Sequence, residues 1–253
     1  MLQYNNWTIE QLEWLPQQEA ELEQQLTFSN DYLCQTAHFE EHYSGDCKLG
    51  TYIKGVEVPI LNISAISIRL HDERLDLHEW NVEQFSRCLH RNEALLERDF
   101  VVTSPRGHTL HITAIRRLFA DHKERMQVVY RIQSVNYTGP VTLLALLRDD
   151  DEASNWYTLI NYVGDNFCWH SFQLPTSNLQ VCCAMNYGIT KNGVALDKRP
   201  IKVEKQDVIG FSVTHAIKEG DVLQLTKNVV VQDSLHHHKD LLIDNTLACL
   251  TNW

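Results

Sequence analysis

The sequence predicts an all-β protein, a large antiparallel β-sandwich with short helical segments at its two ends. Apolar residues alternate with polar ones over long stretches; "MQVVYRIQSV" at 126–135 places Met126, Val128, Tyr130 and Ile132 on one face of a strand. Turn motifs separate these stretches at strand-like intervals, at 104–107, 138–140, 164–166, 191–193 and 218–221. No long amphipathic helix interrupts the series, which disfavours parallel β-α-β units.

Two of these turns predict hairpins. Asn192-Gly193 tolerates the positive φ angles of a tight turn, so we expect 181–189 to pair with 194–199. The turn at 218–221 predicts a second hairpin between "VIGFSVTHAI" and "VLQLTKNVVV". Helical segments are expected at "IEQLEW" (9–14), at "EAELEQQL" (19–26) and in the C-terminal tail, whose leucines are partly at helical spacing.

Composition restricts the class of protein. The chain has 253 residues, of which 43% are hydrophobic and 22% charged, as in ordinary globular proteins. Its net charge of −11 argues against nucleic acid as a partner, because phosphate binding needs a basic surface. The longest apolar run, "VTLLALL", is too short to cross a membrane, and the N-terminus lacks the pattern of a signal peptide. Seven cysteines without CxxC spacing indicate reduced thiols, so we expect a cytoplasmic protein.

Glu40 and Glu41 are candidates for catalysis, because cleavage of a glycosidic bond needs a carboxylic acid and a second group across the sugar. In an extended strand, however, adjacent side chains point to opposite faces of the sheet. The pair could not then flank one bond. We therefore expect hydrogen bonding or ion pairing as their role.

Other polar motifs favour structural roles. The run His236–His238 and the pair His108 and His111 lack the spacing of a zinc site, and the acidic cluster Asp149–Glu152 lacks the pattern of a calcium loop. We expect no bound metal. Neither a GxSxG elbow nor a glycine-rich phosphate loop occurs. The aromatic stretch "NWYTLINYVGDNFCWHSF" (155–172) could stack on a sugar ring, although strand aromatics more often pack in a core.

The segment 26–56 resembles the start of the glycoside hydrolase family 65 enzymes, the maltose, trehalose and kojibiose phosphorylase group. The resemblance is carried by "LTFSNDYL", "FEE" and "GTYIKGV", and extends from about Trp7 to Ser234. The matching positions are Asn30, Tyr32, Leu33, Glu40, Glu41, Gly50, Thr51, Tyr52, Ile53 and Gly55. Three departures occur: Asp31 replaces a glycine, Gln35–Ala37 replaces an Arg-Gly pair, and Leu89-His90-Arg91 stands where the family has Leu-Asp-Met.

The resemblance implies a β-supersandwich of the galactose mutarotase type over 28–234, preceded by an N-terminal extension (1–27). It also implies that 235–253 begins a linker towards an (α/α)6 catalytic barrel, where the general acid and the phosphate-binding groups of the family lie. The chain itself would then carry no catalytic residue and no cofactor, and its parent enzyme would use inorganic phosphate as co-substrate. By motif match, Asn30, Tyr32, Glu40, Glu41 and Tyr52 would lie near the substrate.

The main functional hypothesis is the non-catalytic N-terminal domain of a family 65 phosphorylase or hydrolase acting on α-linked glucose disaccharides, able to form a homodimer. We expect an exposed apolar patch that combines Trp7, Leu12 and Trp14 with 241–250. The alternatives are a carbohydrate-binding module or a stand-alone sugar epimerase. An epimerase would draw its acid and base from Glu97, Glu204, His111, His170 and His215, among which no spacing selects a pair.

Overall fold

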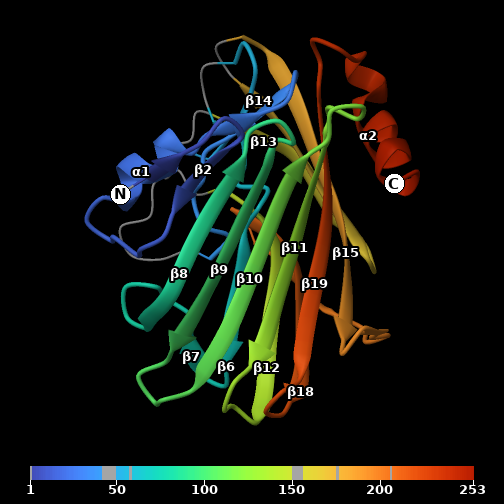
Figure 1. Cartoon of the computed structure of the whole chain (residues 1–253). Coiled ribbons are helices and arrows are strands. Elements are labelled where there is room, and N and C mark those ends of the chain that lie inside the picture. Colours follow the sequence, from blue (N-terminus) through green and yellow to red (C-terminus); the bar gives the residue numbers. More distant parts are fainter. Residues whose placement is uncertain (1, 42–49, 57–58, 150–155, 175–176, 206) are drawn as a thin grey trace.

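Three antiparallel sheets form a sandwich, shown in Figure 1. The structure is a computed structural model and describes residues 2–41, 50–56, 59–149, 156–174, 177–205 and 207–253. Within these ranges the strands and helices together account for most of the chain, and every ladder between named strands is antiparallel. The predicted all-β class is confirmed.

The largest sheet has eleven strands in the described ranges. Ten lie side by side in the order β1-β2-β8-β9-β10-β11-β19-β15-β14-β13, and β16 pairs with β15. Their bounds are β1 Leu2–Tyr4, β2 Thr8–Gln11, β8 Asn81–His90, β9 Leu95–Thr103, β10 Thr109–Leu118, β11 Arg125–Ser134, β13 Tyr157–Val163, β14 Phe167–Leu174, β15 Leu179–Lys191, β16 Val194–Ala195 and β19 Val222–Asp233.

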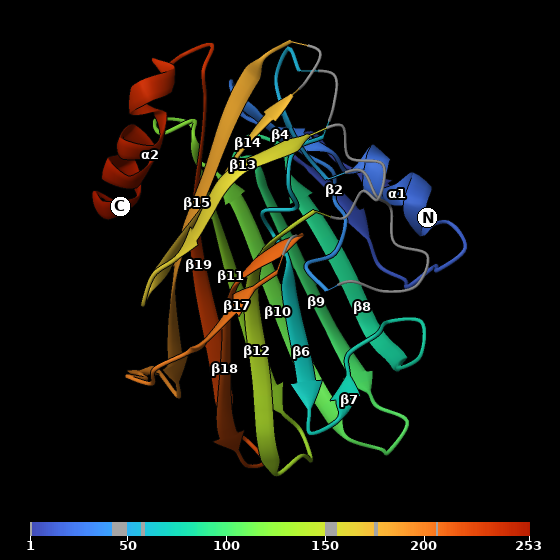
Figure 2. The same ribbon diagram turned by 180° about the vertical axis from the view of Figure 1, so that it is seen from behind.

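A second sheet packs against the first and lies on the side nearer the viewer in Figure 2. Its order is β17-β18-β12-β6-β7, with bounds Ile201–Glu204, Val208–Ile217, Gly139–Arg148, Ile66–Leu70 and Glu73–Arg74. A small third sheet consists of β3 (Phe28–Ser29), β4 (Leu33–Gln35) and β5 (Thr51–Ile53). The buried faces of the two larger sheets share one core, in which Met126, Val128, Tyr130 and Ile132 of β11 are fully buried, as predicted.

Helices occur near the two ends of the chain. α1 (Glu19–Gln25) confirms one predicted helix, and η1 (Lys239–Leu241) followed by α2 (Leu242–Thr251) confirms the other. α2 packs on the outer face of β15 and β19, where Leu250 contacts Ala184 and Val230. None of the helices among the described residues combines the length and the apolar character that a membrane crossing requires.

The third predicted helix is wrong. Residues Thr8–Gln11 form strand β2, which pairs with β8 at the edge of the large sheet. Tertiary contacts favour the strand over a helix here. The alternation of a strand buries Ile9 and Gln11, and Gln11 accepts hydrogen bonds from the buried Arg87. The segment expected to be an N-terminal extension thus contributes β1 and β2 to the large sheet.

One predicted hairpin is confirmed and the other is wrong. β15 and β16 pair across Asn192 and Gly193, whose φ angles are 50° and 80°. β18 and β19 do not pair: β18 lies between β12 and β17, whereas β19 lies between β11 and β15. The turn at 218–221 therefore carries the chain from one sheet to the other.

The predicted apolar patch is also wrong as a single surface. Trp7 and Leu12 are exposed, but Trp14 packs on Phe39 and Phe85 with ring centroids 5.4 and 5.7 Å apart. Figures 1 and 2 place the N-terminal strands and α2 on opposite sides of the molecule. Leu242 and Leu250 of α2 are themselves buried, so the two segments cannot form one patch.

Candidate functional site

Glu40 and Glu41, the two glutamates of the segment 26–56, converge on one guanidinium group. Glu40 lies in a bend after β4 rather than within a strand, so the opposite-face geometry considered for an extended pair does not apply. Arg98 Nη2 donates to Glu40 Oε2 at 2.5 Å and also to Glu41 Oε2. Both carboxylates are 2% exposed or less. The expected ion-pairing role of this pair is confirmed.

Arg98 reaches these carboxylates because strand alternation directs it inward. Its neighbours on the same face of β9, Phe100 and Val102, are fully buried. The guanidinium carbon lies 4.1 Å from the ring centroid of Phe39, and its Nη1 has no hydrogen-bond acceptor among the described residues. A cation in this position is held by carboxylates on one side and aromatic faces on the other.

A second arginine binds Glu40 from the next strand. Arg116 of β10 places its Nε 2.7 Å from Glu40 Oε1, in ionic contact but without hydrogen-bond alignment. Its Nη1 donates to Gln35 Oε1 at 3.1 Å. Burial opposes ionisation of Glu40, but Arg116 and Arg98 outweigh it and hold the pKa of Glu40 below its usual value. Glu40 therefore stays charged inside the sandwich.

Glu41 is held by a tyrosine as well as by Arg98. The hydroxyl of Tyr130 donates to Glu41 Oε1, and burial followed by the nearby Glu41 charge raises the pKa of Tyr130. This hydrogen bond fixes the second carboxylate against the large sheet.

The N-terminal segment completes the buried network. Arg87 of β8 forms an ion pair with Glu19 of α1, and its Nη1 donates to the Ala37 carbonyl at 2.8 Å. Burial lowers the pKa of Arg87, although Glu19 opposes this effect. This network of ion pairs and hydrogen bonds thus joins α1, the segment that carries Glu40 and Glu41, and the inner face of the large sheet.

The remaining motif residues hold turns and strands. Asn30 Oδ1 accepts from the backbone amides of Tyr32 and Leu33 at 2.9 and 2.7 Å, and its Nδ2 donates to the Phe119 and Lys123 carbonyls. The buried Tyr32 hydroxyl donates to Asp233 Oδ2 at 2.5 Å, and burial raises the pKa of Tyr32. Tyr52 lies half-buried on β5.

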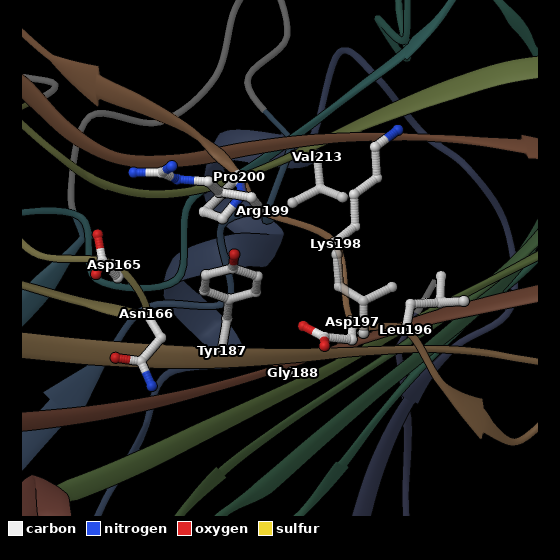
Figure 3. A pocket seen from close by; sticks show the side chains of 11 residues that line it. Asp165, Asn166, Tyr187, Gly188, Leu196, Asp197, Lys198, Arg199, Pro200 and Val213 are labelled. Atoms are coloured by element: carbon white, nitrogen blue, oxygen red, sulfur yellow. The ribbon is translucent and has the colours of Figure 1, made fainter.

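An open hollow of about 490 Å³ lies elsewhere, where β15 and β18 meet the irregular segment 196–200. Figure 3 shows its lining, with the hydroxyl of Tyr187 and the carboxylate of Asp197 turned towards the middle of the group. Lys198 extends away from the group and donates to the Thr214 carbonyl. Asp165 and Asn166 line it from the turn before β14. The hollow thus combines an aromatic ring with exposed polar groups.

This sandwich and its buried motif match a known family. The model of the glycosyl hydrolase family 65 N-terminal domain matches residues 9–251. The chain belongs to this family. The match includes β2 at one end of the large sheet and α2 on its outer face, so both are parts of the family 65 domain.

Similar proteins include two curated phosphorylases. The chain is 26% identical over 179 residues to maltose phosphorylase of Bacillus subtilis (strain 168), which covers 62% of this chain and 24% of that protein. It is 25% identical over 151 residues to kojibiose phosphorylase of Halothermothrix orenii, covering 56% and 19%. The family 65 domain therefore matches about a fifth to a quarter of the length of these relatives.

A solved structure shares the fold. A protein described as a kojibiose phosphorylase from the human microbiome superposes with a TM-score of 0.86 and 18% identity, covering 99% of this chain and 36% of that one. The expected supersandwich architecture is confirmed by this similarity of fold.

The acid and base candidates of an epimerase do not gather in the family 65 domain. Glu97 pairs with His90 at 3.2 Å, and His111 pairs with Asp99 at 2.9 Å, both on the half-exposed face of β9 and β10. Glu204 and His215 lie on β17 and β18 of the second sheet. His170 is buried on β14, and burial lowers its pKa to about 4. These five side chains thus lie on five different strands, and His170 lines a hollow of about 290 Å³ that also contains Trp156 but none of the other four candidates.

The other motifs have local partners. His108 Nδ1 lies 2.9 Å from Glu73, and His236 Nδ1 lies 3.0 Å from Asp233. Among the described residues, no group of three or more His, Cys, Asp or Glu side chains could hold a metal ion. Asp150–Glu152 of the acidic cluster lies outside the described residues.

The aromatic stretch forms the hairpin of β13 and β14. Phe172 is buried against Trp156, with ring centroids 4.8 Å apart, whereas Tyr157 and Tyr162 are exposed. The stretch is thus partly core and partly surface.

The sequence pattern does not predict the hollow of Figure 3. It predicts a turn at 164–166 and a strand over 194–199. β16 in fact ends at Ala195, and the next five residues are irregular. The sequence does contain a signal for this: three consecutive charged residues, Asp197, Lys198 and Arg199, followed by Pro200, break the alternation of a strand.

Proposed function

We propose that this family 65 domain is the non-catalytic β-sandwich of an enzyme that cleaves α-linked glucose disaccharides, with inorganic phosphate as co-substrate and no further cofactor. The family match and the similarity to maltose and kojibiose phosphorylases support this proposal. The role of the domain is to support a sugar site and to form part of its rim.

The burial of Glu40 and Glu41 carries the proposal. A general acid must reach the glycosidic oxygen within hydrogen-bond distance, and it needs a proton to donate at the working pH. Both carboxylates are buried beneath the sheet and bound to Arg98, and the pKa of Glu40 is held low. They cannot protonate a leaving group in solvent. They anchor the segment after β4 to the large sheet. Among the motif residues expected near the substrate, we propose that the partly exposed Asn30 and Tyr52 lie nearest to it, because Glu40, Glu41 and Tyr32 are buried.

The test is an activity assay of the chain alone. We expect no release of glucose 1-phosphate from maltose, trehalose or kojibiose in the presence of phosphate. Turnover clearly above a heat-denatured control would overturn the non-catalytic role. Polarimetry with freshly dissolved α-D-glucose tests the epimerase alternative in the same preparation; accelerated mutarotation would favour that alternative.

We further propose that the protein works in the cytoplasm and that its parent enzyme is a homodimer. The six described cysteines are free thiols, including the adjacent Cys182 and Cys183 on β15, which supports a reducing compartment. Localisation of the tagged protein by cell fractionation tests the first statement, and analytical ultracentrifugation tests the second.

A further inference from the structure

We propose that the hollow of Figure 3 is a non-catalytic binding site for a neutral saccharide of one or two pyranose rings. Its volume of about 490 Å³ falls within the range of small-molecule sites and exceeds what a few waters need. Its walls come from the turn before β14, from β15 and β18, and from segment 196–200, so four separate parts of the chain shape it.

The polar groups of the hollow have unused hydrogen-bonding capacity. The side chains of Asn166, Asp197 and Arg199 make no hydrogen bond or ion pair with any other described residue, although all three line the hollow. Carboxylate oxygens accept hydrogen bonds, a guanidinium donates them, and an amide does both. Neighbouring hydroxyl groups on a sugar ring can donate to Asp197 while accepting from Arg199 and Asn166.

One aromatic ring supplies the apolar contact that a pyranose needs. Tyr187 is half-buried, and its ring lies against Phe211 with centroids 4.9 Å apart, which fixes its orientation. Leu196 and Val213 add apolar surface beside it. A rigid tyrosine flanked by hydrogen-bonding groups matches the amphipathic surface of a sugar, whose C–H face packs on the ring while its hydroxyls bind the rim.

The balance of charge favours a neutral ligand over an anion. Two carboxylates, Asp165 and Asp197, line the hollow together with two cations, Lys198 and Arg199. The Lys198 ammonium already donates to the Thr214 carbonyl and points away from the hollow. Asp165 pairs with Lys202 at 3.5 Å, which leaves Asp197 and Arg199 as the charged groups of the hollow without an ionic partner among the described residues. An incoming phosphate would be repelled by Asp197 as well as attracted by Arg199, whereas hydroxyl groups can satisfy both kinds of partner.

The test measures binding directly by isothermal titration or by saturation-transfer NMR, with maltose, kojibiose and inorganic phosphate as separate probes. We expect saturable millimolar binding of at least one disaccharide and none of phosphate. Asp197→Ala and Arg199→Ala should each weaken binding about tenfold, since each removes hydrogen bonds to a charged group. Both residues are exposed, so the variants should fold, which circular dichroism checks.

Asp207→Asn is the matched control. Asp207 is an exposed carboxylate that lines a different hollow of about 290 Å³, which also contains His170 and Trp156. We expect D207N to bind like the parent chain. Loss of binding in D207N with retention in D197A and R199A would move the sugar to that second hollow and overturn the proposal. An absence of saturable sugar binding would also overturn the proposal, as would saturable binding of phosphate that R199A weakens.

The choice of α-glucosides as probes rests on the proposed function, but the readout involves no catalytic step. Absence of binding together with absence of turnover refutes the saccharide site and leaves the non-catalytic role intact. Turnover by the chain refutes the non-catalytic role, whatever the binding experiment shows.

Discussion

Arg98 shows how single residues determine the interior of this domain. Its guanidinium is the shared partner of Glu40 and Glu41, so Arg98→Met would leave Glu41 buried without its cation and Glu40 with Arg116 alone. Removal of one partner from a buried ion pair costs about 3–5 kcal/mol. We expect R98M to lower the free energy of unfolding by that amount, measured by urea denaturation.

An exposed arginine supplies the control for this prediction. Arg106 forms a bidentate pair with Asp72 at 2.6 and 2.8 Å, but their side chains are 56% and 69% exposed. Solvent screens such a pair, so Arg106→Met should leave stability nearly unchanged. Equal effects of R98M and R106M would show that the buried network does not stabilise the fold.

Lys227 gives the stability of the domain a dependence on pH. Its ammonium is fully buried and donates to the carbonyls of Ala65 and Leu146, and burial lowers its pKa to about 7. In the unfolded chain the lysine keeps its proton up to about pH 10. Between these values the unfolded state binds more protons, so stability rises as the pH increases from 7.

The comparison with Lys227→Met isolates this effect from that of other groups. The buried thiols of Cys168 and Cys183 have raised pKa values and act in the opposite direction at high pH, but both proteins contain them. We expect the free energy of unfolding of the parent chain, relative to that of K227M, to increase by up to about 1.4 kcal/mol per pH unit between pH 7 and 9. A pH-independent difference in urea denaturation would mean that Lys227 stays charged when folded.

The placement of these cations is partly readable from the sequence. The alternation of "VLQLTKNVVV" puts Lys227 on the same face as Leu223, Leu225 and Val229, which are all buried. The partners of Glu40 and Glu41 are not readable, because Arg98 lies more than fifty residues away and nothing local selects it among the other arginines. The alternation of a strand predicts which face of the sheet a side chain lies on, but its ion-pair partner is known only from the tertiary structure.

At the scale of elements, strands and turns are predictable and sheet membership is not. The turns at 104–107 and 218–221 are both short and contain glycine, yet the first joins the paired strands β9 and β10 and the second joins strands of different sheets. The turn residues predict that the chain reverses direction, but they do not predict which strands pair. Whether the next strand pairs with the last depends on the twist and packing of the whole sandwich.

Gly210 tests the pairing of one such element. It lies on β18 opposite Leu146 of β12, with φ of 151°, and a Cβ added there would collide with the Ala145 carbonyl oxygen. Backbone cannot yield as a flexible side chain can, so we expect Gly210→Ala to cost more than the roughly 1–3 kcal/mol typical of overpacking. Thermal unfolding measures this cost.

Gly188 is the matched control for that substitution. It also lies within a strand, β15, but a methyl group added there would meet no described atom within 4 Å, and its φ is not in the left-handed region. Gly188→Ala should be neutral or slightly stabilising, because it reduces the freedom of the unfolded chain. If G210A unfolded at the same temperature as G188A, the close approach of β18 to β12 would be wrong.

At the scale of the whole molecule, the large sheet ends in an exposed strand. β13 is last in the strand order, and four of its apolar side chains are about half exposed or more: Tyr157, Leu159, Ile160 and Tyr162. Residues 157–160 are all exposed, and a bulge between Thr158 and Ile160 interrupts the alternation of the strand. Globular proteins usually protect such an edge with charge or cover, because its backbone can pair with another chain.

We therefore predict that β13 supplies the contact of the proposed homodimer, by antiparallel pairing with β13 of a second copy. Such pairing is self-complementary under a two-fold axis, so one strand type suffices for both halves. Ile160→Lys should shift the protein towards monomer in analytical ultracentrifugation, since a charge on the edge opposes pairing. Val194→Lys, at an even more exposed apolar position on β16, should not. A dimer that survives I160K but dissociates with V194K would place the contact on the hairpin of β15 and β16 instead.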